Sequence, residues 1–175
     1  MLSLQRVKIP VAMPWKQHLL VVANVTSNSE ELVGALKERV KRSPTTVHLV
    51  VPATPLGGGR ESATQRLDDA LGQLRGAGLE ADGAIGHADP FLAVMDVWDP
   101  RRYDEIIVST LPIGVSKWLH AGLPERIERA TGALVTHVVA EPPRHSFETT
   151  PPPPHHDHGV LSPLTVLGWG GAKQA

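Results

Sequence analysis

Cysteine is absent from the chain, which excludes disulfides, zinc–thiolate sites and a cysteine nucleophile. Neither sign of charge dominates, because 17 Lys and Arg residues stand against 18 Asp and Glu residues and the formal net charge is -1. No global field therefore indicates nucleic acid or an anionic membrane as a partner. Long hydrophobic runs are also missing, since charged residues and prolines interrupt residues 1–16 and the longest apolar stretches, such as residues 19–23, have the length of strands. We therefore expect no signal peptide, no membrane span and a cytoplasmic protein.

What the chain does contain is an alternation of strand-like and helix-like segments. With 175 residues, of which 41% are hydrophobic, it can bury one sizeable core. Short apolar runs typical of buried strands cover residues 18–24, 45–51, 81–86, 106–109 and 134–139. Between them, apolar residues recur at helical spacing at residues 32–40, 63–74, 91–98 and 119–130. The pattern predicts a doubly wound α/β fold, in which a five-stranded parallel sheet has helices on both faces.

Several helix boundaries carry local signals. Residues 27–30, Ser-Asn-Ser-Glu, have the pattern of a capping box and predict the start of the first helix. Gly76 is expected to end the second helix, and Asp89 and Pro90 predict the cap and first residue of the third. The fourth helix is expected to be continuous over residues 117–129.

The strand and turn at residues 104–116 predict where a functional site lies. A β-branched run is followed there by the small hydroxyl residues Ser109 and Thr110, and then by a loop with Pro and Gly. If the first and fourth strands are neighbours, the strand order is 3-2-1-4-5. The crevice between their carboxyl ends is then the topological switch point, where α/β sheets bind ligands. Residues 24–26 would face residues 109–111 across this crevice.

Three other patterns suggest chemistry but have a plainer interpretation. Gly57–Arg60 could cradle a phosphate, but it lacks the Lys-Ser/Thr ending of a P-loop, and we interpret it as a permissive loop. His155–His158 has metal-ligating residue types, but neighbouring residues on a proline-rich segment fix no coordination geometry. His87, near the rim of the crevice, is interpreted as a surface histidine. No Gly-x-Ser-x-Gly sequence is present, so hydrolase chemistry lacks a nucleophile.

The two ends of the chain differ from residues 18–140, which we expect to form the α/β domain. Residues 1–17 predict an irregular arm, although the alternate apolar residues at 9–15 would also suit an edge strand or contact with a partner. Residues 141–175 predict an extended Pro/His-rich tail, because its prolines cannot form a packed helix or a central strand. Residues 160–169 of this tail are apolar, and docking on the domain or on a second subunit is one alternative.

Three segments resemble the universal stress protein family. They are Asp104–Thr110, Gly86-x-Ala88-x-Pro90 before a helix, and Leu123–Ile127 before the final strand, and they follow the family's order of elements. The likeness covers about residues 18–140 and implies the family's fold. It also implies a regulatory or binding module, not an enzyme, that binds ATP or another adenine nucleotide with Mg²⁺ at the switch point. Weak ATP hydrolysis stays an open alternative.

The resemblance places the nucleotide at defined positions of this sequence. ATP-binding members have an Asp at the end of the first strand, and this position is occupied by Asn24. The end of the second strand, which borders adenine in the family, is Val51. The candidate nucleotide-binding residues are Asn24, Val25, Thr26, Val51, Ser109, Thr110, Gly114, Ala121, Gly122 and Leu123.

The glycine motif of the family is altered in this chain. Members have Gly-x-x-Gly after the fourth strand and, beyond a spacer of nine, Gly-Ser/Thr; here Ser109 and Pro112 replace the two glycines, and Ala121-Gly122 replaces the final pair. Proline cannot donate a backbone hydrogen bond, and alanine brings a Cβ toward the place of a phosphate. We therefore expect a remodelled triphosphate cradle.

The resemblance also implies a partner, and two other functions stay open. Family members commonly dimerise through the fifth strand, so residues 134–139 are expected to pair in a homodimer, with the tail possible as a second contact. One alternative is a ligand-free interaction scaffold whose crevice is filled by Leu111, Ile113 and Trp118. The other is a nucleotidyl-transferring enzyme of a related fold, for which residues 24–27 offer neither paired histidines nor a Ser-Gly-Gly loop.

Overall fold

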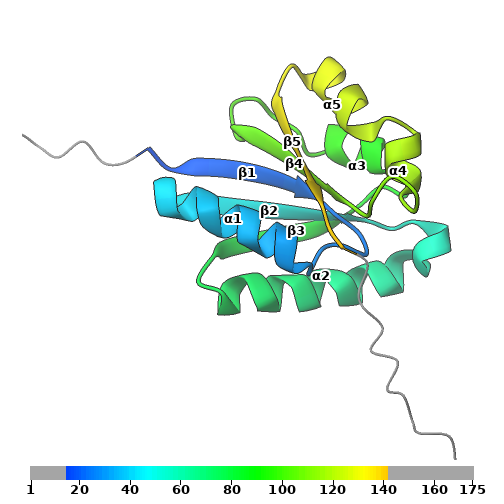
Figure 1. Ribbon diagram of the computed structural model, residues 1–175, viewed down its shortest axis with the longest axis horizontal. Coiled ribbons are helices and arrows are strands. Elements are labelled where there is room, and N and C mark those ends of the chain that lie inside the picture. Colours follow the sequence, from blue (N-terminus) through cyan, green and yellow to red (C-terminus); the bar gives the residue numbers. More distant parts are fainter. Residues whose placement is uncertain (1–14, 142–175) are drawn as a thin grey trace, which may run out of the picture. The chain divides into compact units, whose positions relative to one another are not determined.

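The computed structural model describes residues 15–141, which form a parallel sheet with helices on both faces (Figure 1). The strands are β1 (Gln17–Val22), β2 (Thr45–Pro52), β3 (Glu80–Gly86), β4 (Glu105–Thr110) and β5 (Leu134–Val139). The helices are α1 (Glu30–Arg42), the 3₁₀ turn η1 (Pro55–Gly57), α2 (Gly59–Gly76), α3 (Pro90–Met95), α4 (Lys117–His120) and α5 (Leu123–Thr131). The strand order is β3-β2-β1-β4-β5 and every pairing is parallel. The predicted fold class and strand order are confirmed.

Side chains of β1 alternate between two apolar layers. Leu19 and Val21 pack on one face with residues of α1 and α2, whereas Leu20 and Val22 pack on the other with residues of α3 and α5. All four are fully buried because β1 is the central strand. This position also brings the carboxyl end of β1 beside that of β4.

The first helix is capped two residues later than its sequence predicts. Ser29 is the N-cap of α1, and its hydroxyl accepts a hydrogen bond from the Leu32 amide at 3.2 Å. The Ser27 amide instead donates to the Asn24 carbonyl at 3.0 Å, in the turn that follows β1. The capping-box prediction was therefore right about the helix and wrong about the cap.

The predicted fourth helix is two helices. Gly122 stands between α4 and α5 with φ of 60°, a left-handed conformation that glycine adopts without a steric penalty. Pro124 lies in the first turn of α5, where its missing N–H costs no helical hydrogen bond. The prediction of one continuous helix over residues 117–129 was wrong because a left-handed residue ends a helix.

Two further details of the helices differ from their predicted pattern. α3 buries Ala93 and Val94, whereas Leu92, which was expected on the apolar face, is exposed. The predicted permissive loop is largely structured, because Gly57 belongs to η1 and Gly59 and Arg60 are the first residues of α2.

Several predictions concern residues outside the part that the structure describes. These are the arm up to residue 14, the tail from residue 142, the histidines at 155–158 and the apolar segment at 160–169. Within residues 15–141, no helix is long and apolar enough to cross a membrane.

Candidate functional site

A crevice lies between the loops that follow β1 and β4, at the predicted switch point. It encloses about 150 Å³. Its lining residues are Asn24, Val25, Thr26, Ser109, Thr110, Leu111, Val115, Ser116, Lys117 and Trp118. The parallel pairing of β1 with β4 explains this arrangement, because the carboxyl ends of parallel neighbours meet at one edge of the sheet.

Thr26 joins the two sides of the crevice. Its hydroxyl donates a hydrogen bond to the Ser109 carbonyl at 3.0 Å, and both residues are buried. The Ser109 hydroxyl is enclosed as well, yet it has no hydrogen-bond partner in the described part of the chain. A buried hydroxyl without a partner is costly, so this group is suited to a ligand or an ordered water.

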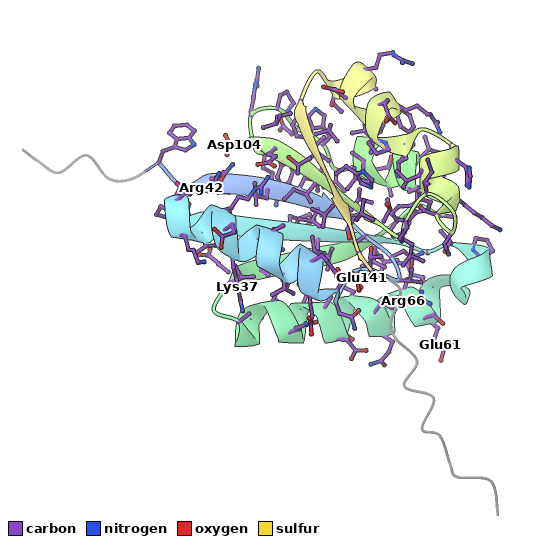
Figure 2. The ribbon with its side chains drawn as sticks, viewed as in Figure 1. Lys37, Arg42, Glu61, Arg66, Asp104 and Glu141 are labelled. Carbon is purple, nitrogen blue, oxygen red and sulfur yellow. The ribbon has the colours of Figure 1, made fainter. Side chains whose placement is uncertain are left out.

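Asn24 is held by two residues that its position in the sequence does not indicate. Its amide nitrogen donates to the Thr54 hydroxyl at 2.9 Å, and Arg66 of α2 donates to its carbonyl oxygen at 3.1 Å. Gly57 lies against the same group, since a Cβ added there would stand 3.4 Å from the Asn24 amide nitrogen. Figure 2 shows Arg66 at the end of the sheet opposite to Asp104.

The sequence carried one signal for Arg66. Ala63, Leu67 and Ala70 form part of the buried stripe of α2, and position 66 falls on that stripe at helical spacing. A charged residue on a buried stripe indicates a polar partner beneath it.

The crevice is electropositive. Among residues 15–141, Lys117 is the one charged residue that lines it, and no acidic side chain does so. Arg66 adds a second cation behind Asn24, and the structure shows no carboxylate in hydrogen-bond or ion-pair contact with it among residues 15–141. The arrangement therefore favours an anionic ligand.

The candidate residues of the sequence analysis are distributed unequally around the crevice. Asn24, Val25, Thr26, Ser109 and Thr110 line it. Val51 and Leu123 are buried in the two apolar clusters, and Gly114, Ala121 and Gly122 are absent from the lining. Of the three side chains expected to fill the crevice in a ligand-free scaffold, Leu111 and Trp118 line it and Ile113 is 68% exposed.

His87 has a local structural role. Its Nδ1 accepts a hydrogen bond from the Asp89 amide at 3.0 Å, beside the cap of α3, and the ring does not line the crevice. Among residues 15–141, no group of three or more His, Asp or Glu side chains is arranged to hold a metal ion.

His137 of β5 contacts the crevice residue Thr110, with its Nε2 2.7 Å from the hydroxyl. Partial burial lowers the pKa of His137 below its ordinary 6.5, although Glu125 opposes the shift. Because the folded state disfavours the protonated ring, this contribution to stability is fully present above the unfolded pKa. It is lost as the pH falls from 6.5 toward the lower folded pKa.

We expect the stability difference between wild type and His137→Gln to change with pH in that window. Urea unfolding at about pH 5, 6, 7 and 8 should show wild type losing more stability in acid than the variant. The change should be small because much of His137 is exposed. His87→Gln serves as the control, and a pH-independent difference for His137→Gln would contradict the prediction.

Comparison with known proteins gives structural matches only. No family model matches the chain, and neither does any curated protein sequence. A universal stress protein solved in complex with cAMP matches with a TM-score of 0.51 at 18% identity, over 71% of this chain and 97% of that one. The universal stress protein of Archaeoglobus fulgidus in complex with dAMP matches with a TM-score of 0.52 at 14% identity, over 72% of this chain and 99% of that one. The chain has the universal stress protein fold.

A second structure of an Archaeoglobus fulgidus universal stress protein gives a similar result. It matches with a TM-score of 0.51 at 14% identity, over 70% of this chain and 93% of that one. The resemblance seen in the sequence is therefore confirmed at the level of the fold. In a universal stress protein fold the crevice beside β1 and β4 is the topological switch point, which fixes where a ligand is expected and not which ligand it is.

Proposed function

We propose that the protein binds an adenine nucleotide in the switch-point crevice and acts as a regulatory module without catalysis. The observation that carries this proposal is the charge of the crevice, where Lys117 is the one charged lining residue in the described part of the chain and Arg66 stands behind Asn24. Cations that lack acidic partners attract phosphate. Two structural matches were solved with cAMP and dAMP, which supports an adenine ring as the other part of the ligand.

The size of the crevice favours a mononucleotide over ATP. Its 150 Å³ is below the range of about 300–1,000 Å³ that is usual for small-molecule sites, so part of any nucleotide must lie outside it, and that part is smaller for AMP than for ATP. A triphosphate also lacks the glycine-rich backbone that would cradle it, because Pro112 follows Leu111 and has no N–H to donate. We therefore expect AMP to bind more tightly than ATP with Mg²⁺.

Calorimetric titration of AMP, MgADP, MgATP and adenosine tests this function. Wild type should bind AMP, and Ser109→Ala should weaken the binding about tenfold, because the ligand loses a hydrogen bond from an otherwise unpartnered hydroxyl. The same variant should be at least as stable as wild type without ligand, since a buried unpaired hydroxyl is removed. Thr64→Ala on the exposed face of α2 is the matched control and should bind AMP as wild type does.

The same titration decides between this function and a ligand-free scaffold. Leu111 and Trp118 already narrow the crevice, which is the observation that favours the scaffold. Absence of heat with all four compounds would reject nucleotide binding and support the scaffold. If AMP binds Ser109→Ala as tightly as wild type, the nucleotide binds at another part of the molecule.

Dimerisation through β5 stays a prediction. β5 is an edge strand, and its Leu134 and Val139 side chains are 64% and 46% exposed. An exposed apolar edge strand is suited to pairing with a second copy of the chain.

A further inference from the structure

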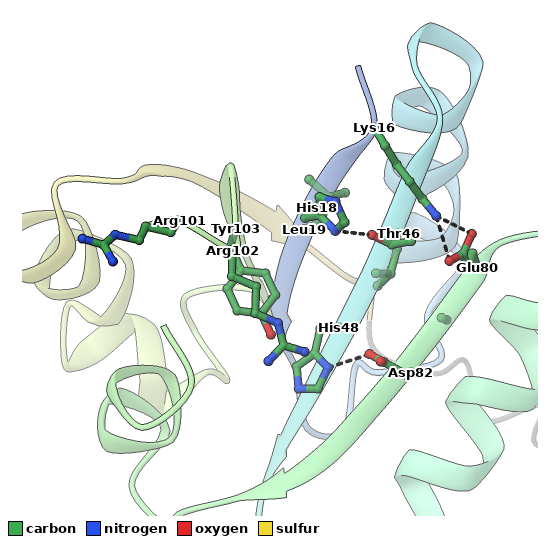
Figure 3. A pocket seen from close by; sticks show the side chains of 12 residues that line it. Lys16, His18, Leu19, Thr46, His48, Glu80, Asp82, Arg101, Arg102 and Tyr103 are labelled. Carbon is green, nitrogen blue, oxygen red and sulfur yellow. Dashed lines mark hydrogen bonds and ion pairs between the residues drawn. The ribbon is translucent and has the colours of Figure 1, made fainter. Parts of the chain in front are cut away.

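A second hollow lies at the other end of the sheet. It encloses about 610 Å³ over the amino ends of β1, β2 and β3 (Figure 3). The strand register puts His18, Thr46 and Glu80 in one row across its floor, and His48 and Asp82 in the next.

No helix within residues 15–141 covers this part of the sheet. α3 is six residues long and packs on the carboxyl-terminal parts of β2 and β3, where a Cβ on Gly86 would meet both Ala93 and Val50. The amino-terminal parts of these strands therefore keep polar side chains on a face that is apolar farther along.

Two histidines on the floor each have their Nδ1 atom in a hydrogen bond with a neighbouring side chain. His48 Nδ1 lies 2.5 Å from the Asp82 carboxylate, and His18 Nδ1 lies 2.7 Å from the Thr46 hydroxyl. Within residues 15–141, neither Nε2 has a hydrogen-bond partner. When the Asp82 carboxylate accepts a hydrogen bond from Nδ1–H, a neutral His48 ring presents Nε2 as an acceptor, which suits a hydroxyl group.

Tyr103 and Arg102 form the wall beside His48. The Tyr103 ring centre is 5.9 Å from that of His48, and the Arg102 guanidinium lies 5.2 Å from the Tyr103 ring centre. Tyr103 is 4% exposed, and its enclosed hydroxyl lacks a partner in the described chain. Burial raises the pKa of Tyr103, so the hydroxyl keeps its proton at neutral pH.

The two acidic residues of the hollow are paired, and its two arginines, Arg101 and Arg102, have no ion-pair partner within residues 15–141. Lys16 is paired with Glu80, with both carboxylate oxygens at 2.9 Å, and Asp82 is bonded to His48. Arg101 points away from these side chains in Figure 3. Arg102 makes no ion pair within residues 15–141, so its five donors are available to an anion.

We propose that this hollow is a second binding site, for a small organic anion that also carries hydroxyl groups, such as a sugar phosphate or a sugar acid. Arg102 holds the anionic group, and the Nε2 atoms of His48 and His18 hold hydroxyls. The volume suits such a ligand, because small-molecule sites usually enclose about 300–1,000 Å³. This site is independent of the nucleotide proposed for the crevice, since the two sets of lining residues share no member.

Calorimetry with glucose 6-phosphate and gluconate tests the proposal and separates phosphate from carboxylate. At least one of the two should bind saturably, whereas neutral glucose and inorganic phosphate should bind much more weakly, because each lacks one of the two recognised groups. Arg102→Gln should weaken the binding at least about tenfold, the effect of losing a hydrogen bond to a charged group. Arg101→Gln removes the same charge from a neighbouring lining residue whose side chain points away from the two histidines in Figure 3, and it should weaken the binding much less.

Two further variants are controls, one for the stability of the fold and one for binding at the crevice. Tyr103→Phe should leave the ligand-free protein at least as stable as wild type, because it removes an unpartnered buried hydroxyl. Ser109→Ala, at the opposite end of the sheet, should bind the sugar anion normally. The proposal is overturned if neither anion binds, if glucose binds as well as the anions, or if Arg101→Gln weakens binding as much as Arg102→Gln.

Discussion

Replacing Glu105 with alanine is expected to lower the free energy of unfolding by about 3 kcal/mol or more. Glu105 is the first residue of β4 and is only 3% exposed. Its carboxylate accepts hydrogen bonds from Arg39 of α1 at 2.7 Å and from Thr136 of β5 at 2.6 Å, and from Gln17 of β1 at 3.3 Å. One carboxylate therefore joins four elements, and its removal leaves the Arg39 guanidinium without its anionic partner.

Urea unfolding followed by circular dichroism measures this loss. Glu38→Ala is the matched control, because Glu38 pairs with Lys41 on the exposed face of α1 and exposed pairs contribute little. The double variant Arg39→Met with Glu105→Leu should recover part of the stability, since apolar residues replace a buried pair at small cost. Equal effects of Glu105→Ala and Glu38→Ala would contradict the assigned role.

The order of strands and helices could be predicted from the sequence because the spacing of hydrophobic residues reflects which side chains are buried. The run from Leu19 to Val22 is apolar on both faces, as a central strand requires. Strand order 3-2-1-4-5 rested on the assumption that the first and fourth strands are neighbours, which periodicity alone does not decide. The break at Gly122 was missed because Leu119, Leu123 and Ile127 keep helical spacing across it, although Gly122 followed by Pro124 is a signal for a new helix start.

The candidate site was predictable where it depends on topology and unpredictable where it depends on packing. Asn24 and Ser109 lie across one crevice because parallel strands end at the same edge. Val51 follows the pleat of β2 into the core with Leu49 and Val47, so its place at the strand end does not put its side chain in the crevice. The contact from Arg66 to Asn24 depends on how α2 packs against the sheet, which the place of Arg66 on the buried stripe of α2 does not specify.

The second hollow had a signal of its own in the sequence. Thr46 and His48 interrupt an apolar strand at alternate positions, which places both on one face of β2. Whether polar residues on one face form a hollow or a solvated surface depends on what covers that face. That information comes from the short α3 and the loop that carries Arg102 and Tyr103.

Reversing both cations of the crevice, Arg66→Glu with Lys117→Glu, is expected to weaken AMP binding about 100-fold or more. Each cation is expected to contribute about tenfold, as a charge-assisted hydrogen bond does, and reversal adds repulsion of the phosphate. The neutral pair Arg66→Gln with Lys117→Gln should lie between this variant and wild type. Adenosine should bind all three proteins similarly because it carries no phosphate.

A control with the same change in net charge separates the crevice from the overall field. Lys37 and Arg42 lie on α1 (Figure 2), and neither lines the crevice, so Lys37→Glu with Arg42→Glu should reduce AMP affinity little at physiological ionic strength. Calorimetry at two salt concentrations measures both effects. If the control pair weakens AMP binding as much as the crevice pair does, long-range charge explains the affinity and the assigned contacts are wrong. If only the crevice pair does so while adenosine binding is retained, the local charge of Lys117 and of Arg66 behind Asn24 stabilises the bound phosphate.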